Sequence, residues 1–469
     1  MTTDTPSLVT RLRNEVAADL AGAGGHDLAP EDRRELARQL VMGRLGALAV
    51  EMIADGVAPY DAENDHRLAR SVLDALFGLG ELQTLIDDPS IENIDVNGCD
   101  CVWVTYSDGT KKRVERIADT DAELIEMLRS AAARLGLSER RFDVAYPELD
   151  LSLPDGSRLS ALMSVVARPI VSIRRHRYVD LTLDDLVGLG AMNSVVASFL
   201  TAAVRARRNI VVGGAMNSGK TTLVRALASA IPPRERVVTI EQAFELGLGS
   251  RTDRHPDIVA VEARNANSEG EGEISMARLV RRALRMNADR VIVGEVLGDE
   301  VLPMLNAMSQ GRSGSMCTIH ADSSLGIFRR LATYAAQAPE RLPLESTNIL
   351  IAGAVHFVVF MEVADEPSVG GGLRGPRPPF HPLDRRSSAE FGETLGAGPE
   401  HFPAVRRRRF VSSVREVLDA EGLQVISNEI FRVGPDGSAV AAAPLRSETL
   451  EALVGHGFEP SGAYAETAW

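Results

Sequence analysis

Cysteine and aromatic residues are scarce in this chain of 469 residues, and basic residues are fewer than acidic ones. Its three cysteines, Cys99, Cys101 and Cys317, are too few for a disulfide framework, so the sequence favours a reducing, intracellular compartment. The chain has 51 basic against 65 acidic residues, a net charge of −14. This balance argues against a general nucleic-acid coat and against a polybasic membrane anchor.

Long hydrophobic runs are missing as well. A membrane-spanning helix needs roughly 18 to 20 successive apolar residues, and even the stretch Leu40–Ile53 is interrupted by Arg44 and Glu51. The first residues, MTTDTPSLVT, contain no apolar segment of the kind that signal peptides have. We therefore expect no direct membrane insertion. The expected location is cytoplasmic, with any peripheral contact to the inner face of the membrane made through partner proteins.

The order of the hydrophobic patterns predicts an α/β protein with two folded domains. The first half shows helical periodicity and then short strand patterns, with a hairpin signal at Asp108 and Gly109. In the second half, apolar strands alternate with helices, which is typical of a mostly parallel sheet covered on both faces. The predicted segments are a helical N-terminal arm at 1–60, an α/β domain at 61–178, a linker at 179–189, a second α/β domain at 190–364, a disordered insertion at 365–405, and a C-terminal appendix with its tail at 406–469.

The strongest motif is GAMNSGKT, residues 214–221, which follows an apolar strand pattern and precedes a helical one. Gly214 and Gly219 allow the backbone to turn its N–H groups inward, and the helix directs its positive end at a phosphate. Lys220 is predicted to neutralise the β- and γ-phosphates, and Thr221 to ligate Mg²⁺. The other nucleotide contacts expected in this segment are Asn217, Ser218 and Thr222. The motif thus predicts ATP and Mg²⁺ as cofactors.

Hydrolysis of a γ-phosphate needs a carboxylate that orients water and an acidic shell around Mg²⁺. Two predicted strand ends carry candidates, Glu295 in DRVIVGEV and Glu241 with Glu245 in RVVTIEQAFEL. Carboxyl ends of parallel strands face the nucleotide in such sheets. We predict catalytic roles for Glu295 and Glu241 and a metal contact for Glu295. The sequence leaves open which glutamate activates water, and either alone is compatible with a solvated surface charge.

His320 ends a further predicted strand in GSMCTIHAD, after a glycine-rich turn at 311–314. This placement suggests that His320 senses the γ-phosphate or couples it to movement, so we count it with Lys220 among the catalytic candidates. A lone histidine is equally compatible with a structural role.

These motifs, in this order, resemble those of the traffic ATPases of type II and type IV secretion systems. The resemblance is closest to the CpaF and TadA branch, which powers Flp-type pilus assembly. It covers about residues 72–361, with weaker similarity before that segment and again over residues 409–433. It rests on the P-loop, an acidic box at 239–246, a Walker B box in LRMNADRVIVGEV and a histidine box in GSMCTIHAD. The N-terminal segments FGLGELQTLIDDPSIENIDVNG, LPDGSR and SIRRH match as well.

The resemblance implies a RecA-like P-loop NTPase domain preceded by a smaller α/β N-terminal domain. It also implies a homo-oligomeric ring, a hexamer, that hydrolyses ATP and acts on inner-membrane platform proteins. The arginines that close the nucleotide site in the family match Arg158 in LPDGSR and Arg174 and Arg175 in SIRRH. Arginine forks suit phosphate oxygens, but they also suit salt bridges to neighbouring acids. By the same resemblance Glu295 is the Walker B glutamate and Glu241 that of the acidic box.

Some positions depart from the family pattern. Gln242 stands where the family usually has aspartate, Leu297 where it has arginine, and Met216 with Asn217 where threonine and glycine are common. Gln242 and Leu297 keep a weakly hydrolysing, nucleotide-binding regulatory subunit as an alternative. A RecA-like motor on nucleic acid is the other, with the Arg406–Arg409 run as its candidate phosphate contact, although the acidic balance argues against it.

Overall fold

The computed structural model contains two compact units. The N-terminal unit consists of residues 1–175 and 368–405, and the P-loop unit of residues 176–367 and 406–469. Each unit has hydrophobic cores of its own. The structure describes residues 5–23, 28–135, 141–175, 181–250, 253–264, 266, 270–310, 313–366, 401–402, 406–434 and 439–460.

The N-terminal unit begins with three helices that pack on one another. They are α1 (Thr5–Gly22), α2 (Pro30–Ala54) and α3 (Ala62–Phe77). Val16, Val41 and Val72, one from each helix, are fully or almost fully buried in a shared core. Arg44 of α2 is paired with Asp19 of α1 at 2.7 Å. The helices predicted within 1–60 are therefore present, and they form a cluster with α3 because each has an apolar stripe to bury.

The rest of the N-terminal unit is an antiparallel sheet with helices packed on it. Its elements are α4 (Glu81–Asp87), β1 (Ile91–Asn97), β2 (Val102–Tyr106), β3 (Lys111–Val114), α5 (Asp121–Leu135), β4 (Glu148–Ser152), β5 (Arg158–Leu162), β6 (Ile170–Arg174) and β13 (His401–Phe402). The strand order is β13-β3-β2-β1-β6-β5-β4. The predicted hairpin joins β2 to β3, where Gly109 has a φ of 88° and donates its N–H to Tyr106.

The P-loop unit is built on a nine-stranded sheet in the order β16-β15-β14-β12-β7-β11-β10-β8-β9. The strands from β12 to β9 run parallel, and β14, β15 and β16 add on antiparallel. Their bounds are β7 (Ile210–Gly214), β8 (Val237–Glu241), β9 (Ile258–Glu262), β10 (Arg290–Val296), β11 (Met316–His320), β12 (Phe357–Glu366), β14 (Arg406–Glu421), β15 (Gln424–Val433) and β16 (Ala439–Ala441). The mostly parallel sheet predicted for the second half of the chain is confirmed.

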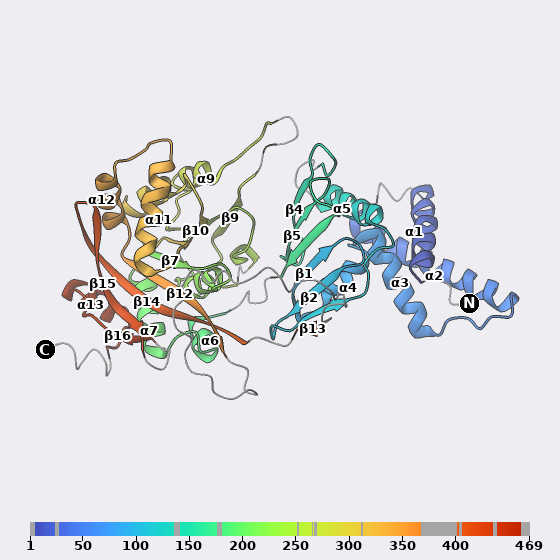
Figure 1. Cartoon of the computed structure of the whole chain (residues 1–469), viewed down its shortest axis with the longest axis horizontal. Helices are drawn as coiled ribbons and strands as arrows, with labels where there is room; N and C mark the ends of the chain where they lie inside the picture. Colours follow the sequence, from blue (N-terminus) through green and yellow to red (C-terminus); the bar gives the residue numbers. More distant parts are fainter. Residues whose placement is uncertain are drawn as a thin grey trace, which may run out of the picture. The chain divides into compact units, whose positions relative to one another are not determined.

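Helices cover both faces of this sheet (Figure 1). Residues of α6, α7, α8 and α13 form one core, and residues of α9, α10, α11 and α12 the other. Ile210 and Val212 of β7 enter the first core and Val211 the second, because successive side chains of a strand point to opposite faces. The helices are α6 (Leu183–Gly188), α7 (Ser194–Arg205), α8 (Lys220–Ala228), α9 (Met276–Ala283), α10 (Val301–Ser309), α11 (Ser324–Gln337), α12 (Leu344–Ala354) and α13 (Ser447–Val454), with a 3-10 turn at Leu248–Ser250. None of the helices in the described ranges is both long and apolar enough to cross a membrane.

Two segments differ from their sequence-based description. The expected linker at 179–189 contains helix α6, because Leu183 and Leu186 are buried in the core and a Thr182 capping box fixes the first turn. The expected appendix at 406–469 belongs to the main sheet through β14, and Phe431 and Phe458 pack edge-on against Phe199. Most of the predicted insertion at 365–405 and the end of the tail lie outside the described residues.

Candidate functional site

The P-loop connects β7 to α8 through a backbone that needs glycine at two positions. A side chain at Gly214 would come within 2.5 Å of the Met361 carbonyl oxygen, so this position admits only a hydrogen. Gly219 has a φ of 92°, in the left-handed region, and is the N-cap residue of α8. Asn217, at φ 60°, adopts the same region, which asparagine tolerates better than most residues. The motif therefore has the tight turn that its glycine spacing predicts.

Three features of the loop suit an anion. The N-terminal turn of α8 has no side-chain cap, so its amides and the positive end of the helix dipole are available to a ligand. The Ser218 hydroxyl is buried and has no hydrogen-bond partner among the described residues. Thr221 is only partly buried, and its side chain makes no hydrogen bond within the described part of the chain. Because buried polar groups are rarely left unpaired, Ser218 fits a ligand-binding loop.

Lys220 is the first residue of α8 and is 7% exposed. Its Nζ donates to the Ala215 carbonyl oxygen at 2.9 Å and lies 3.1 Å from His320 Nδ1. On the other side of the imidazole, His320 Nε2 lies 2.6 Å from Glu295 Oε1. An ammonium group can only donate, so Nδ1 must accept from it and the neutral ring then carries its proton on Nε2. Lys220, His320 and Glu295 therefore form one hydrogen-bonded chain.

The strand ends explain this arrangement. His320 is the last residue of β11, which pairs in parallel with β7 so that His320 lies opposite Gly214. Glu295 is the penultimate residue of β10, on the other side of β11. His320 and Glu295 have side chains 33% and 34% exposed. Neighbouring parallel strands end at the same edge of the sheet, which brings side chains from separate motifs together at the P-loop.

Glu241 occupies a different environment at the end of β8. It is 2% exposed, and its Oε2 accepts hydrogen bonds from the N–H groups of Glu245 and Leu246, both at 2.7 Å. Oε1 accepts from the Thr239 hydroxyl at 3.2 Å. Burial raises the pKa of the Glu241 carboxyl, and the backbone N–H groups oppose that shift by stabilising the anion. The contacts identify Glu241 as an anchor for the turn that follows β8.

The three candidate arginines Arg158, Arg174 and Arg175 belong to the N-terminal unit, whereas the P-loop, both glutamates and His320 belong to the other unit. Arg158 and Arg174 are directly opposite each other on β5 and β6. Like charges in that position are destabilising unless an anion lies between them. Arg175 donates to the Asp88 carbonyl oxygen at 2.5 Å and lies 4.0 Å from Asp155, which is the structural alternative considered for these arginines.

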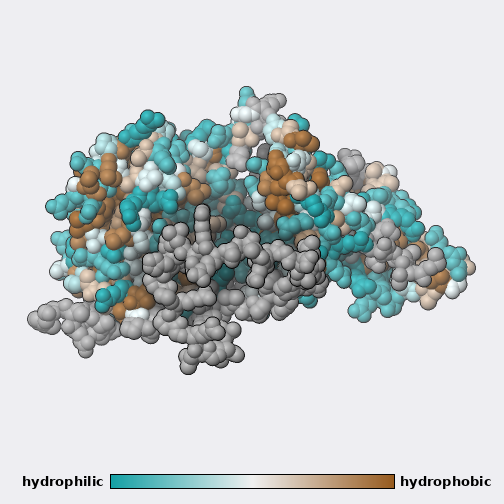
Figure 2. All heavy atoms as spheres, viewed as in Figure 1, coloured by the Kyte–Doolittle hydropathy of each residue, from teal (hydrophilic) through white to brown (hydrophobic). Residues whose placement is uncertain are grey.

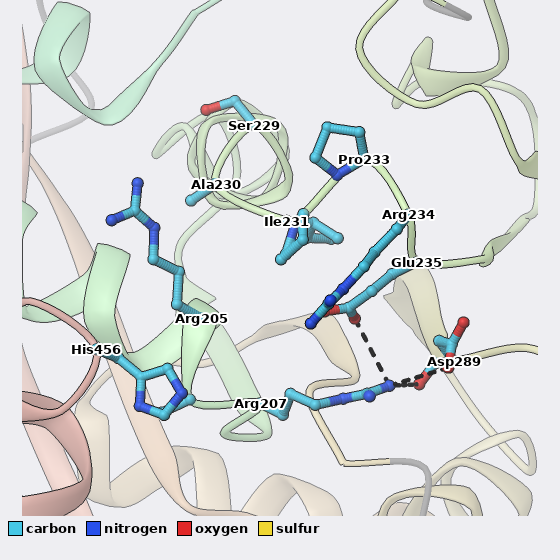
Figure 3. A pocket seen from close by; sticks show the side chains of 12 residues that line it. Arg205, Arg207, Ser229, Ala230, Ile231, Pro233, Arg234, Glu235, Asp289 and His456 are labelled. Atoms are coloured by element: carbon cyan, nitrogen blue, oxygen red, sulfur yellow. Dashed lines mark hydrogen bonds and ion pairs between the residues drawn. The ribbon is translucent and has the colours of Figure 1, made fainter.

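A pocket of about 930 Å³ opens at the amino ends of β7, β8 and β10, the edge of the sheet opposite the P-loop (Figure 3). It is lined by Arg205, Ala206, Arg207, Ser229, Ala230, Ile231, Pro232, Pro233, Arg234, Glu235, Asp289 and His456. Arg207 points at two carboxylates, 3.3 Å from Asp289 and 3.6 Å from Glu235. Nucleotides bind at the carboxyl ends of such sheets, so we place the candidate site at the P-loop and not in this pocket.

Sequence reasoning missed one residue at the P-loop. Arg409, on β14, donates from Nε to the Asn217 carbonyl oxygen at 2.9 Å. In the sequence it was visible only as part of the basic run Arg406–Arg409, and nothing local connects that run to a loop 192 positions away.

A parallel sheet with helices on both faces and a P-loop after a central strand defines a RecA-like P-loop NTPase, as predicted. The particular family follows from comparison with known proteins. A family model described as "Type II/IV secretion system protein" matches residues 76–362. The chain belongs to this family. Membership of the more specific CpaF and TadA branch stays a prediction.

Individual relatives agree with the family. A Mycobacterium tuberculosis protein named for conjugal transfer is 37% identical over 257 residues, which cover 53% of this chain and 70% of that protein. The type IV secretion system protein PtlH of Bordetella pertussis is 38% identical over 169 residues, 35% of this chain and 48% of PtlH. The crystal structure of the VirB11 ATPase from the Brucella suis type IV secretion system is 27% identical with a TM-score of 0.32, covering 61% of this chain and 92% of that one. Because that TM-score is low, the assignment rests on the sequence comparisons.

Proposed function

We propose that this chain is a Mg²⁺-dependent ATPase that powers assembly of a secretion or Flp-type pilus apparatus as a ring-shaped homo-oligomer. The observation that carries the proposal is the hydrogen-bonded chain from the P-loop Lys220 through His320 to Glu295. It places a cation, a proton carrier and a carboxylate at one edge of the sheet, in a chain that belongs to the secretion family.

Each candidate residue has a role in this proposal. The amides and side chains of the P-loop and the first turn of α8 hold the phosphates, and Lys220 neutralises their charge. Thr221 and Glu295 are the residues that would hold Mg²⁺, which when bound neutralises charge on the phosphate oxygens. Glu295, with its partly exposed carboxylate, orients the attacking water and accepts its proton.

His320 and Glu241 have two different supporting roles in this chemistry. The Nδ1 atom of His320 accepts a hydrogen bond from the Lys220 ammonium. A bound phosphate that attracts Lys220 competes with this hydrogen bond. Phosphate binding would therefore change the hydrogen bonding of His320, and this change would reach Glu295 through the 2.6 Å hydrogen bond. Glu241 keeps the turn after β8 in position through its two backbone hydrogen bonds, and it is too buried to meet water.

We propose a hexamer that acts on inner-membrane platform proteins from the cytoplasmic side. An uncovered apolar patch on the N-terminal unit supports association: Val144 is 77% and Val165 68% exposed in loops that flank β4 and β5, and hydrophobic residues gather over this part of the surface in Figure 2. Exposed apolar patches mark interaction surfaces. Relatives named for conjugal transfer and for type IV secretion favour a machine of that class as the partner.

The proposal is tested by steady-state ATPase activity of the full chain with Mg²⁺, while light scattering measures its mass with and without ATP. We expect turnover and an ATP-favoured oligomer of six chains. Nucleotide binding without turnover would support the regulatory alternative instead. DNA-stimulated turnover with salt-sensitive DNA binding would support the nucleic-acid motor.

Arg174 is proposed to contact the nucleotide phosphates. We expect Arg174→Ala to lower kcat/KM about tenfold or more, the cost of one charged hydrogen bond, without changing the melting temperature. Arg175→Ala is the matched control, because Arg175 is held by Asp88 and its loss should act on stability. Unchanged turnover in Arg174→Ala would assign that arginine a surface role.

A further inference from the structure

The start of β14 contacts the P-loop through Arg409. Arg409 donates from Nε to the Asn217 carbonyl oxygen at 2.9 Å. Its Cδ lies 3.6 Å from the position that a Cβ would take at Gly219. The stem of the side chain therefore lies beside Gly219, and the guanidinium group beside Asn217.

Strand pairing fixes this position. Parallel pairing sets Met361 of β12 opposite Gly214 at the end of β7. β12 continues past that point, and antiparallel pairing sets Val363 opposite Arg409 of β14. Arg409 thus belongs to a regular strand of the main sheet, two positions beyond the level at which the P-loop begins. A residue on a sheet strand is held more precisely than one on a loop.

The neighbouring arginine faces the other way. Arg408 lies over the ring of Phe410, 5.2 Å from its centroid, and donates to the Gly190 carbonyl oxygen at 3.4 Å. Successive side chains of a strand alternate between its faces, so only one of these two arginines can face the P-loop. The basic run is therefore not a uniform patch.

Within the part of the chain that the structure describes, Arg409 uses only a small share of its hydrogen-bond donors. A guanidinium group has five N–H donors, and Arg409 uses Nε for Asn217. Its two terminal nitrogens make no hydrogen bond to any residue that the structure describes. The buried Ser218 hydroxyl in the same loop is likewise without a described partner. An arginine fork oriented by one backbone contact is well suited to bind phosphate oxygens.

We propose that Arg409 binds the phosphate chain of the nucleotide held by the P-loop, so that the C-terminal strand completes the site within the same chain. This inference rests on the proposed function of the P-loop. Arg409 lies outside residues 76–362, the part of the chain that the family model matches. The contact is therefore a contribution of the C-terminal segment of this chain.

The test is the Kd of a non-hydrolysable ATP analogue with Mg²⁺, measured on the full chain by calorimetry at two salt concentrations. In Arg409→Gln the amide can still donate to Asn217, but the charge is lost. We expect its Kd to rise about 10- to 100-fold and to depend less on salt, with no change in the melting temperature of the free protein. Arg409→Lys should recover part of the affinity. Arg408→Ala removes the same charge from the opposite face and should stay within about twofold of wild type.

Wild-type affinity in Arg409→Gln would overturn the inference. An equal loss in Arg408→Ala would also overturn it, because the effect would then come from general charge, and a lowered melting temperature in Arg409→Gln would assign Arg409 to loop stability instead. The variant Lys220→Ala distinguishes a failure of the proposed role of Arg409 from a failure of the proposed P-loop function. If that variant fails to bind while Arg409→Gln binds normally, the P-loop function stands and only the role of Arg409 fails; if the wild-type chain binds no nucleotide, the proposed function fails first.

Discussion

Lys220→Ala is expected to lower ATP turnover by about 100- to 1000-fold, the loss that follows removal of one preorganised electrostatic contact. The side chain is buried and is held by the Ala215 carbonyl and by His320, so contacts within the protein fix the position of its charge. Among the described residues, no other cation is hydrogen-bonded to His320, so none takes the place of Lys220 there. The measurement is kcat/KM for ATP with Mg²⁺, together with the Kd of a non-hydrolysable analogue.

A second substitution separates charge from packing. Lys220→Met keeps most of the volume of the side chain and removes only the ammonium group. We expect it to match Lys220→Ala in activity and to keep a melting temperature close to that of the wild type. Turnover at the wild-type rate in both variants would exclude this P-loop as the catalytic site.

Glu295→Gln is expected to preserve nucleotide binding and to reduce turnover by about 100- to 10,000-fold, the range for loss of a general base. The amide oxygen can still accept the hydrogen bond from His320 Nε2, so the geometry of the chain survives while the base is lost. The variant should therefore accumulate in the ATP-bound state. Single-turnover measurements and nucleotide analysis of the purified variant provide the test.

Glu241→Gln is the matched control for Glu295, since it makes the same chemical change one strand away. Both backbone N–H groups, of Glu245 and Leu246, donate to the same oxygen, Oε2, so the amide oxygen of glutamine can take its place while the amide nitrogen donates to the Thr239 hydroxyl. What the substitution removes is the negative charge that strengthens these hydrogen bonds. We expect Glu241→Gln to lower the melting temperature and to lower turnover only as the turn after β8 loosens. Wild-type turnover in Glu295→Gln with abolished turnover in a stable Glu241→Gln would exchange the two assignments.

Much of the P-loop unit could be predicted because its signals are local. The strand patterns around residues 210–214 and 290–296 are short apolar runs, and buried parallel strands have that composition. The segment at 183–188 was missed as a helix because six residues give too short a period to recognise. The pairing of β14 with the main sheet could not be predicted either, because its alternating pattern is compatible both with a separate hairpin and with an extension of that sheet.

In the candidate site too, some features could be predicted from local sequence and others depend on how the strands are arranged. Gly214, Gly219 and Lys220 are recognised by spacing within eight residues, because a phosphate loop is built from one continuous backbone turn. Glu295 and His320 were predicted from strand ends, but a strand end does not reveal which neighbour it meets. Their shared hydrogen bond depends on β10 and β11 being adjacent, which is a property of strand order.

The amino-acid sequence is sufficient to assign the class of this protein: an acidic α/β chain with a P-loop between strand and helix, and family motifs in the order of the secretion ATPases. The folded structure was needed to show that Lys220, His320 and Glu295 are linked, that Glu241 is buried and bound to backbone, and that Arg409 lies beside Asn217. The two kinds of information differ in the sequence distance over which the underlying interactions act. Turn geometry and hydrophobic periodicity act over a few residues, whereas contacts between distant segments are set by strand order and register, which form only when the whole sheet packs.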